Sequence, residues 1–393
     1  MILEAYDDQL DIAEPLWPIS TPCARNGTQK YCIYSNPDFA DGRGIIFFTS
    51  PERAAEVARS SAFTNPAVVR SVPELNAAES PYWRVEYVEG KGMGMIANKN
   101  FRIGDHIMSS TPSFMIDYNV FHYVPENQVV QMEADAASTL PANHGAIFMN
   151  LSTHDEVDSY ETRVAKIILT NSFDIEEKGV VSREDEEEET WYTVFPEISR
   201  LNHDCRANAD YHFDVTTLTQ HIHAVRPIAA GEEITISYVD PILPREVRRK
   251  RLETSWHFPC SCSLCMQNEH QTNASDARIW QILELRRQLR DYTPGSAATP
   301  AMGELMVSLY EQERLYSSMY EAYTYAALEY NGVGEPWLAT KYARLAVQHG
   351  LAAGGPEDQD VLVMKELAKD PWSHWSWMLR TRKRMNWGSA VEQ

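Results

Sequence analysis

Four cysteines constrain the fold of this chain more than any other feature of its sequence. Cys260, Cys262 and Cys265 form a C-x-C-x-x-C cluster. Three thiolates this close in sequence can converge on one tetrahedral Zn²⁺, and a closed structural site needs a fourth ligand. Cys205, which lies upstream in the stretch Leu-Asn-His-Asp-Cys, is the candidate for that ligand. The cysteines therefore predict one structural zinc ion that holds two distant segments of the chain together.

Alternatives to this four-cysteine zinc site remain open in the sequence. The thiols could be surplus or could form local disulfides, although their tight spacing favours a metal in an intracellular chain. His203 or His257 could also replace one of the thiolates. The two other cysteines, Cys23 and Cys32, could form a small disulfide.

The same chemistry bears on where the protein resides. Zinc thiolates suit the cytosol or the nucleus, and the first fifteen residues lack the basic region and apolar core of a secretory signal. A disulfide between Cys23 and Cys32, together with three Asn-x-Ser/Thr sequons, would suit secretion instead. We therefore expect a cytoplasmic or nuclear protein, with the secretory pathway as the minority alternative.

The charge balance argues against one class of partner. The 393 residues include 35 Lys and Arg against 56 Asp and Glu, a formal charge of −21, whereas nucleic-acid binding depends on surplus basic residues. With 44% hydrophobic and 23% charged residues, the chain can bury a core. No apolar run approaches the ~18 residues that span a membrane. We expect a folded, acidic protein of two or three domains without direct nucleic-acid contact or a membrane span.

Apolar and polar residues alternate at three places in the centre of the chain, as they do in half-buried strands. The first stretch places Trp83, Val85 and Tyr87 on one face. Polar and Ala-rich sequence over about 120–170 predicts a helical insertion. The three expected strands are residues 83–88, 191–195 and 234–238.

The N-terminal residues 1–80 are expected to form an extension that packs on this centre. Their clearest element is a helix from Pro51 to Arg59, with proline in its first turn and Ser50 as its cap. Farther along, the acidic run from Glu184 to Glu189 is interpreted as a solvated loop between two strands, because like charges at this density stay hydrated.

From about Asp276 the apolar residues recur at steps of three and four, which is typical of helices. We assign the tryptophans at 372, 375 and 377 to the core rather than to a ligand groove, because aromatic residues at helical spacing usually face the interior. The helix pairs resemble tetratricopeptide (TPR) packing in style, although no period of roughly 34 residues is visible. The pattern predicts an α+β fold followed by an all-α domain. The first helical stripe is Ile279, Ile282, Leu285 and Leu289.

Two further motifs are candidates for a functional site. The turn Gly90-Lys-Gly-Met-Gly94 follows the first expected strand, and glycine lets the backbone approach a ligand closely. It is not the dinucleotide fingerprint, because another turn and not a helix follows, so a hairpin turn is the default interpretation. The stretch Gly231-Glu-Glu-Ile-Thr-Ile-Ser-Tyr238 ends in a tyrosine whose hydroxyl could orient or deprotonate a substrate, or simply be satisfied in the core.

The order of these motifs closely resembles that of the SET-domain methyltransferases. The resemblance extends from about Trp83 to Cys265, and it is greatest to the SET-and-MYND branch and its fungal relatives. The MYND finger is missing, because the insertion contains no cysteine. The motifs are, in order, Gly92-x-Gly94, Thr170-Asn171-Ser-Phe173, Asn202-His203-x-Cys205, Gly231-Glu-Glu-Ile-x-Ile-x-Tyr238 and Phe258-x-Cys260-x-Cys262-x-x-Cys265.

The resemblance implies a domain order. Residues 81–270 would form a strand-rich SET domain, with a helical insertion over about 117–170 and a zinc-bound post-SET segment over about 256–270. Residues 1–80 would be the N-terminal extension, and residues 271–393 a helical, TPR-like C-terminal domain.

The resemblance also implies a cofactor, since SET proteins bind S-adenosylmethionine opposite a narrow channel that admits the substrate lysine. The zinc ion, on Cys205 and the three clustered cysteines, would hold one wall of the cofactor pocket. The residues that would bind the cofactor are Lys91, Gly92 and Met93 through their backbone, Asn171, Asn202 and His203 around its ends, Phe258 on the adenine, and Tyr238 near the methyl group.

Two aromatic residues would line the substrate channel. Tyr238 would close it near the transferred methyl group, and Trp256 stands where close relatives carry a second tyrosine. Tryptophan can wall a channel and attract a cation through its face, but it lacks the hydroxyl. The implied reaction is methyl transfer to a lysine amine in a basic segment of a protein substrate, which the acidic surface would attract. The alternative is a binding or scaffold protein that retains the cofactor pocket, or a protein that acts on a small molecule.

Overall fold

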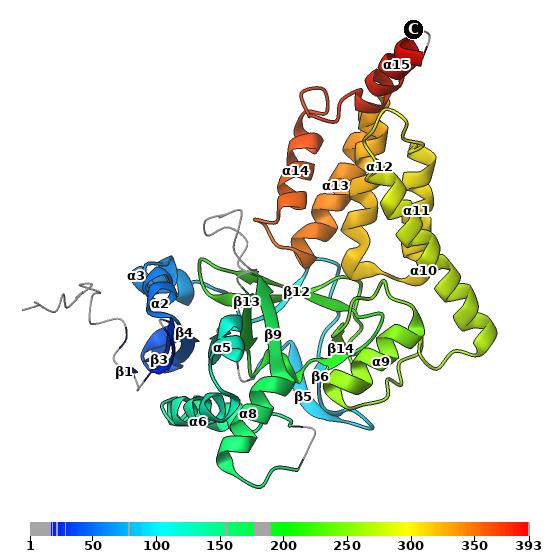
Figure 1. Ribbon diagram of the computed structural model, residues 1–393. Coiled ribbons are helices and arrows are strands. Elements are labelled where there is room, and N and C mark those ends of the chain that lie inside the picture. The colour runs from blue at the N-terminus through cyan, green and yellow to red at the C-terminus, as the bar shows by residue number, and fades with distance from the viewer. Residues whose placement is uncertain are drawn as a thin grey trace, which may run out of the picture. The chain divides into compact units, whose positions relative to one another are not determined.

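The computed structural model describes residues 17, 19–20, 23–27, 29–77, 79–153, 156–176 and 190–391. The expected acidic loop at 184–189 lies outside these ranges. By its internal contacts the chain divides into two compact units, and Figure 1 labels many of their helices and strands. The first unit comprises Met1–Leu75, Ser110–Ser199 and Val215–Thr219, and the second comprises Asn76–Ser109, Arg200–Asp214 and Gln220–Gln393. Within the described ranges, no helix is long and apolar enough to cross a membrane.

The first unit is built on a seven-stranded sheet of order β1-β3-β4-β8-β10-β9, in which β2 pairs with β3. β4 and β8 run parallel, with Ile46 opposite Phe114. The N-terminal residues therefore share one sheet with central strands and contribute to its pairing as well as to its packing. The expected strand at 191–195 is present as β10. The strands are β1 Ile19–Ser20, β2 Ala24–Asn26, β3 Gln29–Asn36, β4 Ile45–Thr49, β8 Phe114–Asp117, β9 Ser172–Glu176 and β10 Thr190–Val194.

One helix of the first unit, α2, begins where the sequence predicts it. The Ser50 side chain caps α2 by accepting a hydrogen bond from the Arg53 amide at 3.3 Å, and Pro51 lies in the first turn. The predicted helical insertion is present as α5 to α8, whose apolar side chains share a core with the sheet. The helices are α1 Phe39–Gly42, α2 Pro51–Ala58, α3 Ser61–Thr64, α4 Pro66–Arg70, α5 Tyr118–Tyr123, α6 Glu126–Ala137, α7 Ala142–Met149 and α8 Tyr160–Asn171.

A disulfide joins Cys23 to Cys32. It ties the residue just before β2 to the partner strand β3, which pairs with β2 in antiparallel register. The expected pairing of these two cysteines is therefore present in the structure.

The second unit contains a four-stranded sheet of order β11-β14-β6-β5 and a three-stranded sheet of order β12-β13-β7. The expected strand at 83–88 is present as β5, but Val85 is 37% and Tyr87 is 71% exposed, so the prediction of a half-buried face is wrong beyond Trp83. A period of two shows which side chains share a face, not whether another element covers that face. The strands are β5 Trp83–Val88, β6 Gly92–Ala97, β7 His106–Ser110, β11 Asn202–His203, β12 Ala209–Asp214, β13 Thr219–Ala224 and β14 Glu233–Ile236.

Four histidines cluster on the three-stranded sheet. The ring centroid of His212 on β12 lies 5.1 Å from that of His221 and 5.2 Å from that of His223, both on β13. The His106 ring, on β7, lies 5.1 Å from that of His223. Burial and, after it, the neighbouring rings lower the pKa of His212 and His106 to about 4 and that of His223 to about 3. The cluster is therefore neutral at physiological pH.

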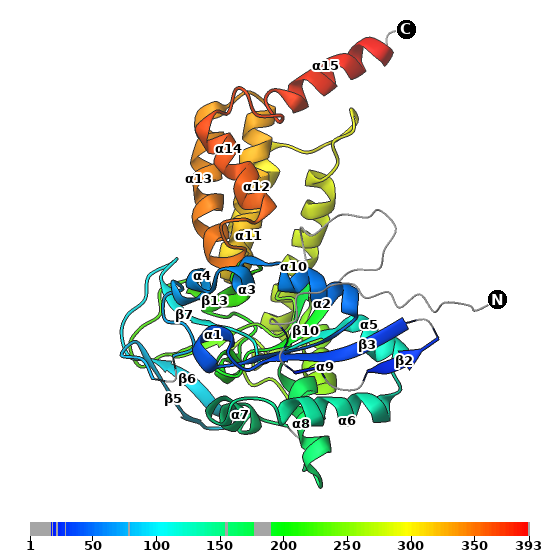
Figure 2. The same cartoon turned by 90° about the vertical axis from the view of Figure 1, so that its left-hand side faces the viewer.

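The predicted helical region is present in the second unit. The helices α11, α12, α13 and α14 lie side by side in both views (Figures 1 and 2), and the predicted stripe from Ile279 to Leu289 is buried in their core. The helices are α9 Arg245–Trp256, α10 Glu269–Leu289, α11 Pro300–Glu313, α12 Met319–Gly332, α13 Pro336–Ala353, α14 Gln359–Lys369 and α15 Leu379–Val391, with short 3₁₀ turns η1 Ile198–Arg200 and η2 Tyr316–Ser318.

The assignment of the C-terminal tryptophans to the core is wrong for two of them. Trp372 is 52% and Trp375 is 50% exposed, whereas Trp377 is half-buried. All three lie in the turns between α14 and α15. The helical periodicity on which the assignment depended is therefore absent at these residues.

Candidate functional site

Three strands of the second unit bring the glycine turn and the Asn-His motif together. β14 pairs in parallel with β11, with Asn202 opposite Thr235, and antiparallel with β6, with Ile234 opposite Met95. A Cβ atom on Gly94 would lie 2.7 Å from Asn202 Nδ2 and 2.8 Å from Glu233 Oε1. Only glycine therefore leaves room at this position for the two polar side chains.

The Glu233 carboxylate links two of the predicted cofactor residues. Its Oε1 accepts a hydrogen bond from Asn202 Nδ2 at 2.9 Å, and its Oε2 lies 2.6 Å from Lys91 Nζ. The Lys91 and Glu233 side chains are only 26% and 16% exposed, so solvent screens this ion pair less than it would an exposed one. The arrangement fixes the Asn202 amide and holds the lysine against the sheet.

Gly92 and Met93 follow Lys91 in the sequence and are the first two residues of β6. Gly92 has a φ of +82°, a conformation that L side chains rarely adopt, so the turn requires glycine there. The Met93 side chain is 44% exposed.

Tyr238 lies two residues beyond the end of β14, and not on the strand as the alternation suggested. Its hydroxyl donates a hydrogen bond to the Leu201 carbonyl oxygen at 2.7 Å. Its ring centroid lies 5.3 Å from that of Trp256 and 6.4 Å from that of Phe258. Burial, with a smaller contribution from Glu233, raises the pKa of the Tyr238 hydroxyl. The tyrosine therefore stays neutral at physiological pH.

His203 connects this aromatic group to the cysteines. Its Nδ1 accepts a hydrogen bond from the Tyr238 backbone N–H at 3.0 Å, which leaves the ring proton on Nε2. Nε2 lies 3.3 Å from Cys205 Sγ and donates to it. Burial lowers the pKa of His203 to about 4, so the ring is neutral. In this arrangement His203 supports the cysteine and does not replace it.

The four predicted metal ligands come together. Cys205, Cys260, Cys262 and Cys265 are buried, are not disulfide-bonded, and place their sulfur atoms within 4.8 Å of one another. Cys205 Sγ lies 3.6 Å from Cys265 Sγ. Such a set of four thiols could hold one metal ion, and an all-sulfur donor set with this convergence fits tetrahedral Zn²⁺. His257, the other alternative ligand, is exposed and takes a left-handed conformation at the end of α9.

Asn171 lies in the first unit, at the C-terminal end of α8. Its Nδ2 donates hydrogen bonds to the carbonyl oxygens of Ser152, at 2.9 Å, and Ile167, at 2.8 Å. The other predicted cofactor residues lie in the second unit.

Comparison with known proteins identifies the domain that contains Asn202, His203, Cys205 and Tyr238. Residues 92–239 match the model of the SET domain. The chain contains a SET domain over these residues. This match confirms the family that the order of the motifs predicts.

The relatives of this SET-domain protein include named methyltransferases. It is 27% identical over 222 residues to the histone-lysine N-methyltransferase set5 of Schizosaccharomyces pombe. The aligned region covers 56% of this chain and 59% of the relative. It is 36% identical over 101 residues to the mouse histone-lysine N-methyltransferase SMYD3. The aligned region covers 25% of this chain and 23% of the relative. The chain thus spans less than two thirds of the length of these relatives.

Comparison with solved structures supports no conclusion beyond the match to the SET domain. The SET domain of LSMT, solved with lysine and AdoHcy, matches 80% of this chain and 88% of its own at 12% identity, with a TM-score of 0.28. A TM-score this low carries no argument about the site.

One residue of the site was not recognised in the sequence. Glu233 is part of the quoted motif around Gly231, yet nothing in that motif shows that its carboxylate reaches both Asn202 and Lys91. The link depends on the pairing of β14 with both β6 and β11, and these pairings join segments far apart in the chain.

Proposed function

We propose that this SET-domain protein transfers a methyl group from S-adenosylmethionine to a lysine amine of a protein substrate. The observation that carries the proposal is the position of the aromatic cluster. Tyr238, at the end of the matched SET domain, packs against both Trp256 and Phe258. The names of the relatives support a protein lysine as the substrate.

In this proposal the cofactor lies along the glycine turn. The backbone of Lys91, Gly92 and Met93 would hold its methionine part, and Phe258 would stack on its adenine. Asn202 and His203 would bind its ends. When bound, S-adenosylmethionine supplies a methyl group on a sulfonium centre.

Tyr238 and Trp256 would prepare the lysine amine for attack. The amine must be neutral and aligned with the sulfonium, and apolar aromatic walls would remove its hydration shell. The Tyr238 hydroxyl proton is committed to the Leu201 carbonyl oxygen, so its oxygen remains an acceptor for an amine hydrogen. Because burial raises the pKa of Tyr238, this residue would orient the amine as a neutral group and not act as a phenolate base.

A zinc ion held by Cys205, Cys260, Cys262 and Cys265 completes the proposal. It would fix residues 256–270 as a post-SET segment and so place Phe258, two residues before Cys260, against Tyr238. We further propose a SET domain over 81–270, an N-terminal extension over 1–80 and a TPR-like C-terminal domain over 271–393.

The substrate would present a basic, lysine-containing segment, which suits the net charge of −21, and the protein would act in the cytoplasm or nucleus without direct nucleic-acid contact. Trp256 favours a second candidate function. Without the family's second tyrosine, the chain would serve as a binding or scaffold protein with a retained cofactor pocket, or would act on a small molecule.

Two measurements test the proposal. Calorimetry with S-adenosylmethionine checks cofactor binding, and a tritiated-methyl assay on cell extract checks transfer to protein. Cofactor binding without a labelled protein band would contradict protein methylation and favour the second candidate.

The variant Trp256→Tyr separates the two candidates. It restores a hydroxyl beside Tyr238, so a methyltransferase limited by the missing hydroxyl should gain activity. A scaffold protein should bind the cofactor as before and gain none.

A further inference from the structure

One arginine of the second unit joins two segments of the proposed site. Arg206 follows Cys205 directly, and its Nη1 donates hydrogen bonds to the Cys205 carbonyl oxygen at 2.8 Å and to the Pro241 carbonyl oxygen at 3.0 Å. Cys205 lies shortly after His203 in the sequence, and Pro241 lies shortly after Tyr238. The guanidinium group therefore ties the segment with the Asn-His motif to the segment with the channel tyrosine.

This tie lies beyond the paired part of the two strands. The register of β11 and β14 ends at His203 and Ile236. Farther along, two hydrogen bonds hold Tyr238, from its backbone N–H to His203 Nδ1 and from its hydroxyl to the Leu201 carbonyl oxygen. Arg206 adds a contact on the other side of the tyrosine, so the position of Tyr238 is fixed from both ends of its segment.

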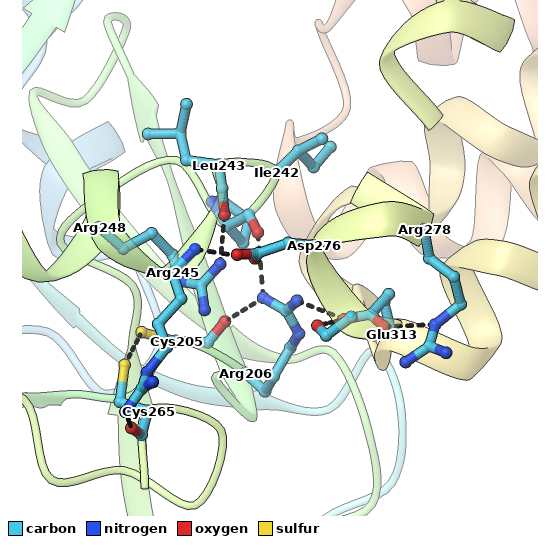
Figure 3. Close-up of polar contacts among 12 residues, drawn as sticks. Cys205, Arg206, Ile242, Leu243, Arg245, Arg248, Cys265, Asp276, Arg278 and Glu313 are labelled. Carbon is cyan, nitrogen blue, oxygen red and sulfur yellow. Dashed lines mark hydrogen bonds and ion pairs between the residues drawn. The ribbon is translucent and has the colours of Figure 1, made fainter. Parts of the chain in front are cut away.

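A carboxylate from the helical region orients Arg206. Glu313, the last residue of α11, accepts a hydrogen bond from Arg206 Nη2 at 2.9 Å (Figure 3). The Arg206 and Glu313 side chains are only 3% and 2% exposed, so solvent hardly screens this ion pair. Because a guanidinium group is planar, a partner on one nitrogen also sets the directions of the other N–H groups. Glu313 therefore determines where Arg206 Nη1 points.

The Glu313 carboxylate is itself held by α10. Ser275 Oγ donates to its Oε2 and Arg278 Nε donates to its Oε1, each at 2.6 Å (Figure 3). Arg278 thus contacts the oxygen that does not face Arg206, and its side chain is 32% exposed. Two helices therefore fix the carboxylate to which Arg206 is bound.

We propose that Glu313, acting through Arg206, is a positioning residue of the site, and that the helical region uses this pair to hold Tyr238 against the Asn202–His203 segment. The role in cofactor binding rests on the proposed function, whereas the holding of the two segments does not. A displacement of about 1 Å at a reacting group can cost about a hundredfold in rate, so such a tie affects a site that its residues do not touch.

The experiment uses the full chain and a paired substitution. Arg206→Met with Glu313→Met removes the tie without leaving either charge unpaired, and replacing a buried ion pair by apolar side chains often preserves stability. Arg278→Met is the matched control, because it removes a hydrogen bond from the same carboxylate without touching Arg206. Glu311→Gln, at an exposed position on α11, is the surface control. Thermal melting checks that each variant is folded.

Hydrogen exchange followed by mass spectrometry measures the tie without any ligand. The reporters are the Asp204 amide, bonded to the Ile236 carbonyl oxygen at 3.0 Å, and the Tyr238 amide. We expect the paired substitution to speed exchange in these two segments about tenfold, as the loss of a charged hydrogen bond does. Calorimetry should show S-adenosylmethionine binding weakened by about tenfold, and both controls should match the parent chain.

Three outcomes would overturn the proposal: unchanged exchange in the paired variant, an equal rise in Arg278→Met, or faster exchange with unchanged cofactor affinity. If the paired variant does not fold, Glu313→Gln replaces it in the same comparison with Arg278→Met. A parent chain that binds no S-adenosylmethionine would refute the proposed function alone, because the exchange measurement decides the role of the Arg206–Glu313 pair without the cofactor.

Discussion

Glu133 provides a sharp test of the electrostatics of the first unit. The residue lies on α6, is 3% exposed, and is flanked by the core residues Val129 and Ala136. Burial alone raises the pKa of its carboxyl group to about 8. In the unfolded chain the same group titrates near 4.5. Between these two pH values the folded state keeps a proton that the unfolded state releases.

The sign of the effect follows from this difference in bound protons. The folded state binds more protons from pH 4.5 to about 8, so stability is lost as the pH rises through that range. One pKa unit corresponds to about 1.4 kcal/mol. Over the interval from pH 4.5 to pH 7 the loss amounts to about 3 kcal/mol.

The substitution Glu133→Gln removes the titration and keeps the shape of the side chain. We expect the free energy of unfolding of the variant, relative to the parent chain, to rise by about 3 kcal/mol between pH 4.5 and pH 7. Urea unfolding followed by circular dichroism at four or more pH values measures this change. Glu126→Gln, at an exposed position on the same helix, is the control. If Glu133→Gln and the parent chain give parallel pH profiles, the reasoning is refuted.

Three further predictions concern the second unit. Glu233→Gln removes the ion pair with Lys91, and we expect calorimetry to show weaker S-adenosylmethionine binding by about tenfold, corresponding to about 1.4 kcal/mol; unchanged binding would exclude a positioning role. Because the pKa of His223 is lowered to about 3, the free energy of unfolding falls as the pH drops below 6.5, by about 2 kcal/mol at pH 5. Unfolding measurements on His223→Asn over the same pH range should not show this fall. Cys205→Ser should lower the zinc content measured by elemental analysis from one ion per chain, and full retention of zinc would contradict the four-thiol site.

Local signals in the sequence predicted part of this structure well. Ser50 followed by Pro51 is a complete helix start within a few residues, and it needs no information from the rest of the chain. The convergence of the four cysteines was also predictable, because three closely spaced thiols need one more ligand to complete a tetrahedral site, and Cys205 lies upstream to supply it.

Features that depend on distant neighbours were not predictable in the same way. Tyr87 shares its alternation with buried strands, yet its exposure depends on what packs against that face. The link from Glu233 to Lys91 exists because β14 pairs with β6, which follows Lys91 in the sequence. Such a contact joins residues that no short motif relates.

The disulfide in the first unit affects how the protein should be handled. Cys23 and Cys32 are oxidised, whereas the four clustered cysteines are reduced. A thiol reductant in the purification buffer would protect the cluster from oxidation but would open the β2–β3 link, and an oxidising buffer would do the reverse. A metal-loaded preparation in mild reductant, checked by mass spectrometry for the loss of two hydrogens from one cysteine pair, would keep both sulfur states intact.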